Sequence, residues 1–328
     1  MRALLIFLLI PLYLFAFEIK PVLPLPVLGF QQIAFDDRSI SVWYPVAPET
    51  EGKVSDDPWD LFKVAPAAKP SLKPPLIVVS HGYMGDPHNL NWLIRGLVDQ
   101  GFAVAAVRHR DMIDGRPHMN HWMRAVDVSK MLDALEKSSL ASSIDFKRIG
   151  FAGFSLGGTT GIFLAGGRAE NLENPLPGKE YSAPREFSRA DEALKTLKKG
   201  EMQKDYRERR IRAFFLMAPA WSWIFSDESL AQVDVPVYLI AGAADEILVT
   251  DTNAGRFARQ IPGAYYQTIP GKVGYFVFIT SLSDVKKLKV NQQIISDRVF
   301  KDDPSIDRDW IQAKTLTEAV RFFNETFR

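Results

Sequence analysis

The 328-residue sequence contains no cysteine, so no disulfide framework and no cysteine-linked lipid anchor can form. It also lacks a charge imbalance, because 40 Lys and Arg residues against 39 Asp and Glu residues leave a formal net charge of +1. That balance gives no electrostatic basis for binding nucleic acid, and we expect no such partner. Neither a G-x-G-x-x-G nor a Walker pattern is present, so we also expect no nucleotide cofactor.

Histidine is scarce and unevenly placed. The five histidines are His81, His88, His109, His118 and His121, and all of them lie in the first half of the chain. His118 and His121 lack the HExxH context of a zinc site. Their spacing is interpreted as a surface coincidence, and no metal is expected.

The one long apolar run stands at the N-terminus, from Ala3 to Phe17. It is shorter than the roughly 20 apolar residues that a membrane span needs. One positive charge before the run and the small Ala16 near its end are typical of a secretory signal peptide over residues 1–17. We expect an exported protein, periplasmic or secreted. An uncleaved N-terminal anchor, which would keep the chain close to a membrane, is the alternative.

Residues 18–328 are predicted to form one large domain in which short apolar strands alternate with amphipathic helices. Strands are predicted at Gln31–Asp37, Ser39–Tyr44, Leu76–Ser80, Phe102–Val107, Arg148–Phe154, Arg212–Met217, Val235–Ala241 and Ala264–Ile269, and helices at Asn89–Gln100, Trp122–Glu136 and Lys314–Phe327. This alternation predicts an α/β fold with a mostly parallel sheet covered by helices on both faces. Residues 45–75, rich in proline and charge, are predicted to be a long surface connection.

The stretch at about 168–210 interrupts this alternation and is dense in Lys, Arg and Glu. It includes helical pieces such as Ala190–Lys199. An insertion at this point of such a fold would overhang the C-terminal edge of the sheet, where ligands bind. We interpret it as a charged helical cap. A solvated excursion without a role is the alternative.

The strongest motif is Gly153-Phe154-Ser155-Leu156-Gly157, which fits G-x-S-x-G and is followed by Gly158. It follows an apolar strand and opens a helix, the context in which this motif forms a nucleophile elbow. Glycine is needed at Gly153 and Gly157 because larger side chains would collide in so sharp a turn. Ser155 is therefore the candidate nucleophile, with a helix N-terminus beneath it that favours developing negative charge.

Two further segments supply the expected partners of this serine. The loop Ser80-His81-Gly82-Tyr83 directly follows a predicted strand, and the backbone N–H groups of Tyr83 and Leu156 are the candidate oxyanion-hole donors. His81 is interpreted as bracing this loop rather than transferring protons. Asp245 follows a late strand and is the candidate triad acid, since a carboxylate there can orient an imidazole.

These segments resemble the predicted dienelactone hydrolases of the α/β-hydrolase superfamily, a group that is also similar to platelet-activating-factor acetylhydrolases. The resemblance rests on Ser41–Pro45, Val79–Gly82, Ala105–Asp111, Trp122–Val128, Gly153–Gly158 and Ala241–Asp245. It spans most of the chain from about Phe30 onward. It implies an α/β-hydrolase fold and cofactor-free hydrolysis of esters or acyl groups by a Ser–His–Asp triad.

The sequence departs from that group at one essential position. The group's histidine would follow the last strand, in a segment resembling Pro-Gly-x-x-Gly-His, but here Tyr275 stands in that place. Serine is a weak nucleophile without a neighbouring base, and a tyrosine with a pKa near 10 is almost wholly protonated at neutral pH. Two rescues remain open: a Tyr275 with its pKa lowered by Lys272, or His118 or His121 folding over the site.

Two hypotheses follow. The first is an exported serine hydrolase that cleaves small-molecule or lipid-derived esters with Ser155 as nucleophile and Asp245 as acid. The second is a pseudo-hydrolase, in which the fold serves as a binding or interaction module after losing its base. In the second case Tyr275 would fill the space of the histidine and hydrogen-bond Asp245.

Overall fold

The computed structural model describes residues 25–328 except 55–58, 60, 174–194 and 283–296. The predicted leader at residues 1–17 lies outside this part of the chain. Within the described ranges, no helix combines the length and the apolar character needed to cross a membrane.

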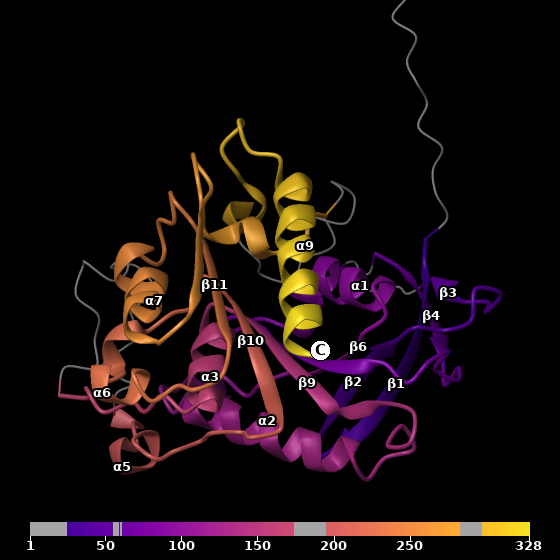
Figure 1. Cartoon of the computed structure of the whole chain (residues 1–328), viewed down its shortest axis with the longest axis horizontal. Helices are drawn as coiled ribbons and strands as arrows, with labels where there is room; N and C mark the ends of the chain where they lie inside the picture. The colour runs from indigo at the N-terminus through magenta and orange to yellow at the C-terminus, as the bar shows by residue number, and fades with distance from the viewer. Residues whose placement is uncertain (1–24, 55–58, 60, 174–194, 283–296) are drawn as a thin grey trace, which may run out of the picture.

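A ten-stranded sheet forms the centre of the described chain (Figure 1), in the order β12-β11-β10-β9-β5-β6-β2-β1-β4-β3. The six strands from β12 to β6 run parallel to one another, and β2 joins them in antiparallel orientation. The prediction of a mostly parallel sheet is thus confirmed. The strands are β1 (Val27–Phe35), β2 (Arg38–Tyr44), β3 (Lys53–Val54), β4 (Lys63–Pro66), β5 (Pro75–Ser80), β6 (Ala103–Val107), β9 (Asp145–Phe154), β10 (Ile211–Met217), β11 (Val237–Gly242) and β12 (Tyr265–Ile269).

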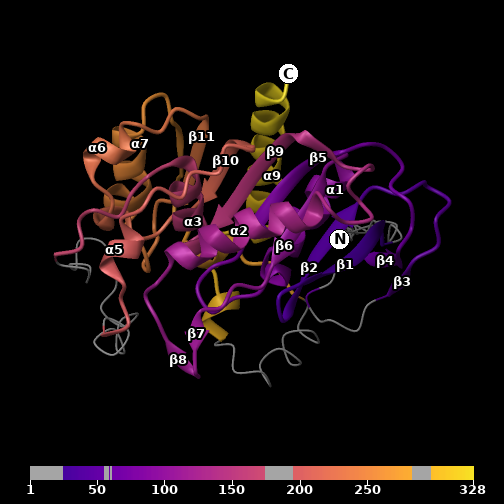
Figure 2. The ribbon, with the colours of Figure 1, turned by 90° about the horizontal axis from the view of Figure 1, so that it is seen from below.

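Helices cover both faces of the sheet, as the alternation of elements predicts. Figures 1 and 2 show α1 (Asn91–Asp99) and α9 (Arg308–Thr326) on one face, and α2 (Trp122–Leu135) and α3 (Leu156–Ala165) on the other. The shorter elements are η1 (Pro87–Leu90), β7 (Met112–Ile113), β8 (Arg116–Pro117), α5 (Lys199–Met202), η3 (Ser222–Ile224), α6 (Asp227–Leu230), η4 (Asp251–Gly255), α7 (Arg256–Gln260), η5 (Tyr275–Phe278) and η6 (Asp297–Phe300).

The central strands are apolar on both sides because each side faces a helix layer. In β5, Leu76 and Val78 pack into the cluster beneath α2 and α3. Ile77 and Val79 pack into the cluster beneath α1 and α9. This two-sided burial explains the continuous apolar runs in the sequence, since neither face of these strands meets water.

The surface connection predicted at residues 45–75 is partly wrong. Within it, β4 pairs with β1 in parallel and β3 pairs with β4, so the segment extends the sheet. Trp59 and Phe62 are buried there. Strands of two and four residues are too short to show an alternating pattern, and the prolines around them favour a prediction of loop.

The region interpreted as a cap, at about 168–210, is described only at its two ends. Most of the predicted helix Ala190–Lys199 lies outside the described residues. The C-terminal end is fastened to Asn120, whose side chain donates to the carbonyl of Thr196 at 2.9 Å and accepts from the N–H of Lys198 at 2.9 Å. Asn120 precedes α2, so this end of the insertion lies at the edge of the sheet where the parallel strands finish. Its role as a cap stays a prediction.

Candidate active site

Ser155 stands at the junction between β9 and α3. Its backbone has φ 56° and ψ −116°, a conformation that residues with a side chain avoid because of steric strain. The N–H of Ser155 donates to the carbonyl of Met217 at 2.9 Å, and its carbonyl accepts from Ala220 at 3.2 Å. These bonds to β10 and the loop after it hold the strained turn in place. This is the elbow conformation that the motif predicts.

The two motif glycines are required by close backbone approach. A Cβ on Gly153 would lie 2.3 Å from the carbonyl oxygen of Gly157. A Cβ on Gly157 would lie 2.1 Å from the carbonyl oxygen of Ser80. Both separations are far below van der Waals contact, so the strand, the helix and the loop after β5 can meet only if both residues are glycine.

The loop after β5 reaches Ser155 from the other side. A Cβ built on Gly82 would lie 3.5 Å from the Cβ of Ser155, so the loop that carries Tyr83 passes directly over the serine. Leu156 is the first residue of α3, where backbone N–H groups lack partners within the helix. The structure therefore brings together the two segments whose N–H groups are the predicted oxyanion-hole donors.

Asp245 lies just beyond the end of β11. Its Oδ1 atom accepts hydrogen bonds from the N–H groups of Ile247 at 2.8 Å and Leu248 at 2.7 Å. Its Oδ2 atom is buried and has no hydrogen-bond partner among the described residues. Burial raises the pKa of Asp245 to about 7, against the opposite effect of the two backbone bonds. A carboxylate held in one orientation with one oxygen unused is what an imidazole N–H would require.

Tyr275 begins η5, and its loop lies beside the loop of Asp245, because the N–H of Ala244 donates to the carbonyl of Val273 at 2.9 Å. Its ring packs against Phe154, the residue before Ser155, with ring centroids 4.8 Å apart. The expected hydrogen bond from Tyr275 to Asp245 is absent at Oδ2, which has no hydrogen-bond partner in the described part of the chain. Instead, the tyrosine ring turns toward the apolar surface of Phe154.

The proposed help from Lys272 has no support in the contacts of this residue. Its Nζ atom forms an ion pair with Asp303 at 3.0 Å on the surface. The charge of the ammonium group is therefore paired with a carboxylate, and Lys272, Asp303 and Tyr275 line one cavity of about 270 Å³.

The interpretation of His118 and His121 as surface residues is wrong, since each is only 3% exposed. Both ring nitrogens of His118 are used, by the carbonyl of Arg110 and the N–H of Asn120. The ring of His121 packs edge-on against Trp221, with centroids 4.4 Å apart, and lies 6.0 Å from that of Tyr83. Since Trp221 follows the residue that bonds Ser155, His121 lies at the border of the site.

His121 is nevertheless poorly suited to act as a base. Its Nδ1 atom is buried without a hydrogen-bond partner in the described ranges. Burial, followed by the charge of Arg124, lowers the pKa of His121 to about 3. An imidazole with so low a pKa holds a proton weakly and is a weak general base.

His81 braces the loop after β5, as predicted. Its Nδ1 atom donates to the carbonyl of Gly82 at 2.7 Å, and its Nε2 atom accepts from the backbone N–H of His109 at 3.0 Å. These two partners fix the tautomer, because a carbonyl only accepts and an N–H only donates. With both ring nitrogens engaged, His81 has none to offer Ser155.

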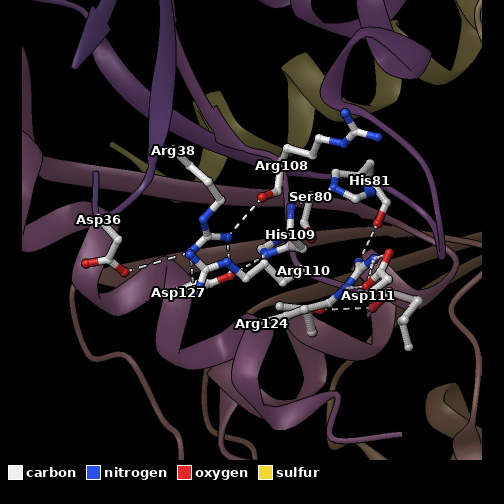
Figure 3. A network of polar contacts seen from close by, with 12 residues as sticks. Asp36, Arg38, Ser80, His81, Arg108, His109, Arg110, Asp111, Arg124 and Asp127 are labelled. Atoms are coloured by element: carbon white, nitrogen blue, oxygen red, sulfur yellow. Dashed lines mark hydrogen bonds and ion pairs between the residues drawn. The ribbon is translucent and has the colours of Figure 1, made fainter. Parts of the chain in front are cut away.

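Sequence reasoning missed a second array of serine, histidine and aspartate beneath this loop (Figure 3). Ser80 Oγ lies 2.9 Å from Nε2 of His109, and Nδ1 of His109 lies 3.2 Å from Asp127, which Arg38 holds with two hydrogen bonds. The array has the bonding order of a catalytic triad. Ser80 is completely buried, however, so this serine cannot meet a substrate and the array is structural.

Comparisons with known proteins find a family similar to part of the sequence and solved structures similar in fold. Residues 66–192 match a family model described as PET hydrolase-like. This range includes the loop after β5 and the elbow but ends before Asp245 and Tyr275. The structure is similar to a ferulic acid esterase from Streptomyces cinnamoneus, with a TM-score of 0.59 and 19% identity over 94% of this chain and 92% of that chain.

The chain has an α/β-hydrolase fold. A second structure, a predicted CIB-like hydrolase from Thermoplasma acidophilum, aligns with a TM-score of 0.44 and 13% identity over 81% of this chain and 97% of that one. No curated protein matches the sequence. At 19% identity, the likeness to the esterase establishes the fold of this chain and leaves its substrate to chemical argument.

Proposed function

We propose that this chain is a serine hydrolase of carboxylic esters. Ser155 is the nucleophile, the N–H groups of Tyr83 and Leu156 form the oxyanion hole, and Asp245 is the acid. The observation that carries the proposal is the strained conformation of Ser155 at a strand-to-helix turn that lies directly under Gly82. The match to a PET hydrolase-like family and the likeness to an esterase support it.

In this proposal, Ser155 attacks the ester carbonyl and an oxyanion develops on the carbonyl oxygen. The two N–H groups and the N-terminus of α3 stabilise that charge, while the alcohol leaves and an acyl-enzyme remains. Water then releases the acid. Both steps need a base to take a proton, and Tyr275 stands where an imidazole would perform this task.

The lack of an imidazole predicts slow turnover rather than none. Removing a triad member typically leaves a rate about 10³- to 10⁴-fold above the uncatalysed reaction, supplied by the oxyanion hole and by binding. Within the described residues, Oδ2 of Asp245 has no hydrogen-bond partner, so no group there replaces the imidazole that a triad acid orients. We therefore place the deficiency of this site at Tyr275.

The substrate proposed for this site is a small-molecule or lipid-derived ester with an apolar acyl group. The ring of His121 packs against those of Tyr83 and Trp221, and the three rings form an aromatic wall near Ser155. Such a wall favours apolar or aromatic groups over charged ones. Export through the leader at residues 1–17 is part of the proposal, and N-terminal sequencing of the mature protein from its host would test it.

A specific observation favours the alternative of a pseudo-hydrolase that binds without turnover. The ring of Tyr275 packs against Phe154 and so occupies apolar space beside the nucleophile. If this contact evolved to close the site, ligands would bind to the surface around Tyr83 and no covalent step would follow.

Covalent labelling separates the two functions. An aryl fluorophosphonate should modify the folded protein, and mass spectrometry should locate the label on Ser155. Ser155→Ala should abolish the label, whereas Ser80→Ala should retain it because Ser80 is completely buried. No label on Ser155 in the folded wild-type protein would refute the hydrolase and leave the binding module.

A further inference from the structure

A buried ion pair lies directly behind the loop that carries Tyr83. Arg124, in the first turn of α2, and Asp111, in the loop after β6, have side chains that are 2% and 5% exposed. They are joined by hydrogen bonds of 2.7 to 2.9 Å from Nε and Nη2 of the arginine. Burying two charges costs free energy that their attraction often does not recover, so stability alone does not explain an ion pair at this depth.

The other hydrogen bonds of this ion pair are made to the backbone of the loop. Nη1 of Arg124 donates to the carbonyl of His81 at 2.7 Å, and Nη2 donates to the carbonyl of Gly82 at 3.1 Å. Oδ2 of Asp111 accepts from the N–H of Met84 at 2.7 Å. Figure 3 shows Arg124 and Asp111 facing each other beneath His81. The peptide groups on both sides of Tyr83 are therefore held by one ion pair.

These contacts decide where the N–H of Tyr83 points. A trans peptide directs its carbonyl and the following N–H to opposite sides. Because the carbonyl of Gly82 faces Arg124, the N–H of Tyr83 faces away from Arg124. Gly82 itself lies against Ser155.

The ion pair shares the task of orienting the Gly82 carbonyl with Nδ1 of His81, which donates to it at 2.7 Å, and with the N–H of Gly85, which donates to it at 3.2 Å. Met84 has φ 55°, in the left-handed region that costs a residue with a side chain about 1 kcal/mol or more. The bond from its N–H to Asp111 opposes that strain. Tyr83 and Met84 are also 44% and 54% exposed, so about half of each side chain faces solvent.

We propose that Arg124 and Asp111 are positioning residues that hold the N–H of Tyr83 in the orientation an oxyanion at Ser155 requires. Neither side chain touches the substrate. Their effect reaches the reaction only through the loop. The catalytic part of the proposal rests on the proposed hydrolase function, whereas the holding of the loop does not.

Two variants test it, with a control of the same kind. Arg124→Lys keeps a positive charge for Asp111 but loses the fork that reaches two carbonyls, and Asp111→Asn keeps the shape but weakens the pair. Arg210→Lys is the control, because Arg210 also pairs with a carboxylate, Glu208, and donates to a carbonyl, that of Ser129. Each variant is first compared with wild type by thermal unfolding.

Two readouts are measured on the full chain. The first is hydrogen exchange of the backbone amide of Met84, whose N–H donates to Asp111. Its exchange should become roughly tenfold faster in both variants and stay unchanged in the control. The second is Ser155-dependent release of p-nitrophenol from p-nitrophenyl butyrate. Its kcat should fall about 100-fold, as when one oxyanion donor is lost, while KM changes by less than about threefold.

Each outcome has one meaning. Unchanged exchange in both variants overturns the holding role, whatever the activity. Faster exchange with unchanged kcat overturns the catalytic role. If wild-type p-nitrophenol release equals that of Ser155→Ala, the proposed function fails and the catalytic role fails with it, while the exchange data still decide whether the pair holds the loop. Faster exchange with a lower kcat and a constant KM supports the proposal.

Discussion

Asp245 is buried, and its Oδ2 atom has no hydrogen-bond partner within the described part of the chain. Burial raises its pKa to about 7, well above the value near 3.9 expected in an unfolded chain. Between these pH values the unfolded chain has released a proton that the folded chain still holds. The contribution of Asp245 to the free energy of unfolding therefore decreases as pH rises from about 4 to about 7.

Asp245→Asn should remove this dependence. Relative to the variant, the wild-type free energy of unfolding should fall by up to about 1.4 kcal/mol per pH unit across this range. Urea unfolding of both proteins at about pH 4.5, 5.5 and 6.5 measures the difference. Two curves that stay parallel over this range would show that Asp245 ionises normally in the folded protein.

Among single residues, the sequence predicts those that belong to a recognisable motif. It does not predict those that only the packing of separate segments brings together. Ser155 and Asp245 follow strands in recognisable patterns. Arg124 and Asp111 lie 13 residues apart with no such pattern, and only the fold places both of them behind Tyr83. The burial of His121 was missed for the same reason, since Trp221, which packs against its ring, comes from a distant segment.

The elbow is an element whose geometry depends on two glycines and the strand before them. Gly157→Ala should destabilise the protein by about 3 kcal/mol, because the new Cβ would lie 2.1 Å from the carbonyl oxygen of Ser80 and must push backbone aside. The same change should abolish labelling of Ser155.

Gly200→Ala is the matched control for this substitution. Gly200 lies in the short helix α5, and no atom of the described residues comes within 4 Å of the place that a Cβ would take. Alanine there should be neutral or stabilising by about 0.5 to 1 kcal/mol. Urea unfolding and fluorophosphonate labelling of both variants check the pair. Equal stability of the two variants would mean that the turn has room for a Cβ.

Element boundaries were predictable wherever an apolar run or an amphipathic period was long enough. The strand predicted at Arg148–Phe154 is β9, and the helix predicted at Trp122–Glu136 is α2. The strands β3 and β4 were missed because two to four residues carry no period. Helix α9 begins at Arg308, earlier than predicted, after a cap in which Asp307 accepts from the N–H of Trp310.

Over the whole molecule, buried histidines should make the fold sensitive to acid. Burial, with a further contribution from Arg124, lowers the pKa values of His81, His109 and His121. Below about pH 6.5 the unfolded chain therefore binds more protons at these histidines than the folded chain does, so stability is lost as pH falls. Asp245 acts in the opposite direction with a single proton.

Because three histidines oppose one carboxyl group, the free energy of unfolding should decrease as pH falls below about 6.5. Thermal unfolding at about pH 7.5, 6.0 and 5.0 should show a melting temperature that falls steadily. A melting temperature that stays constant to about pH 5 would indicate that these histidines become protonated in the folded state without cost.

The central claim is that this α/β-hydrolase-like site has a competent nucleophile and acid and lacks only an imidazole. The most direct measurement is the rate of p-nitrophenyl butyrate hydrolysis by wild type, Ser155→Ala and Tyr275→His, from about pH 5 to 9. We predict that Tyr275→His raises the Ser155-dependent rate by about 10²- to 10⁴-fold, with activity that rises as the new histidine loses its proton. A rate no higher than that of wild type, in a folded Tyr275→His protein, would contradict the claim.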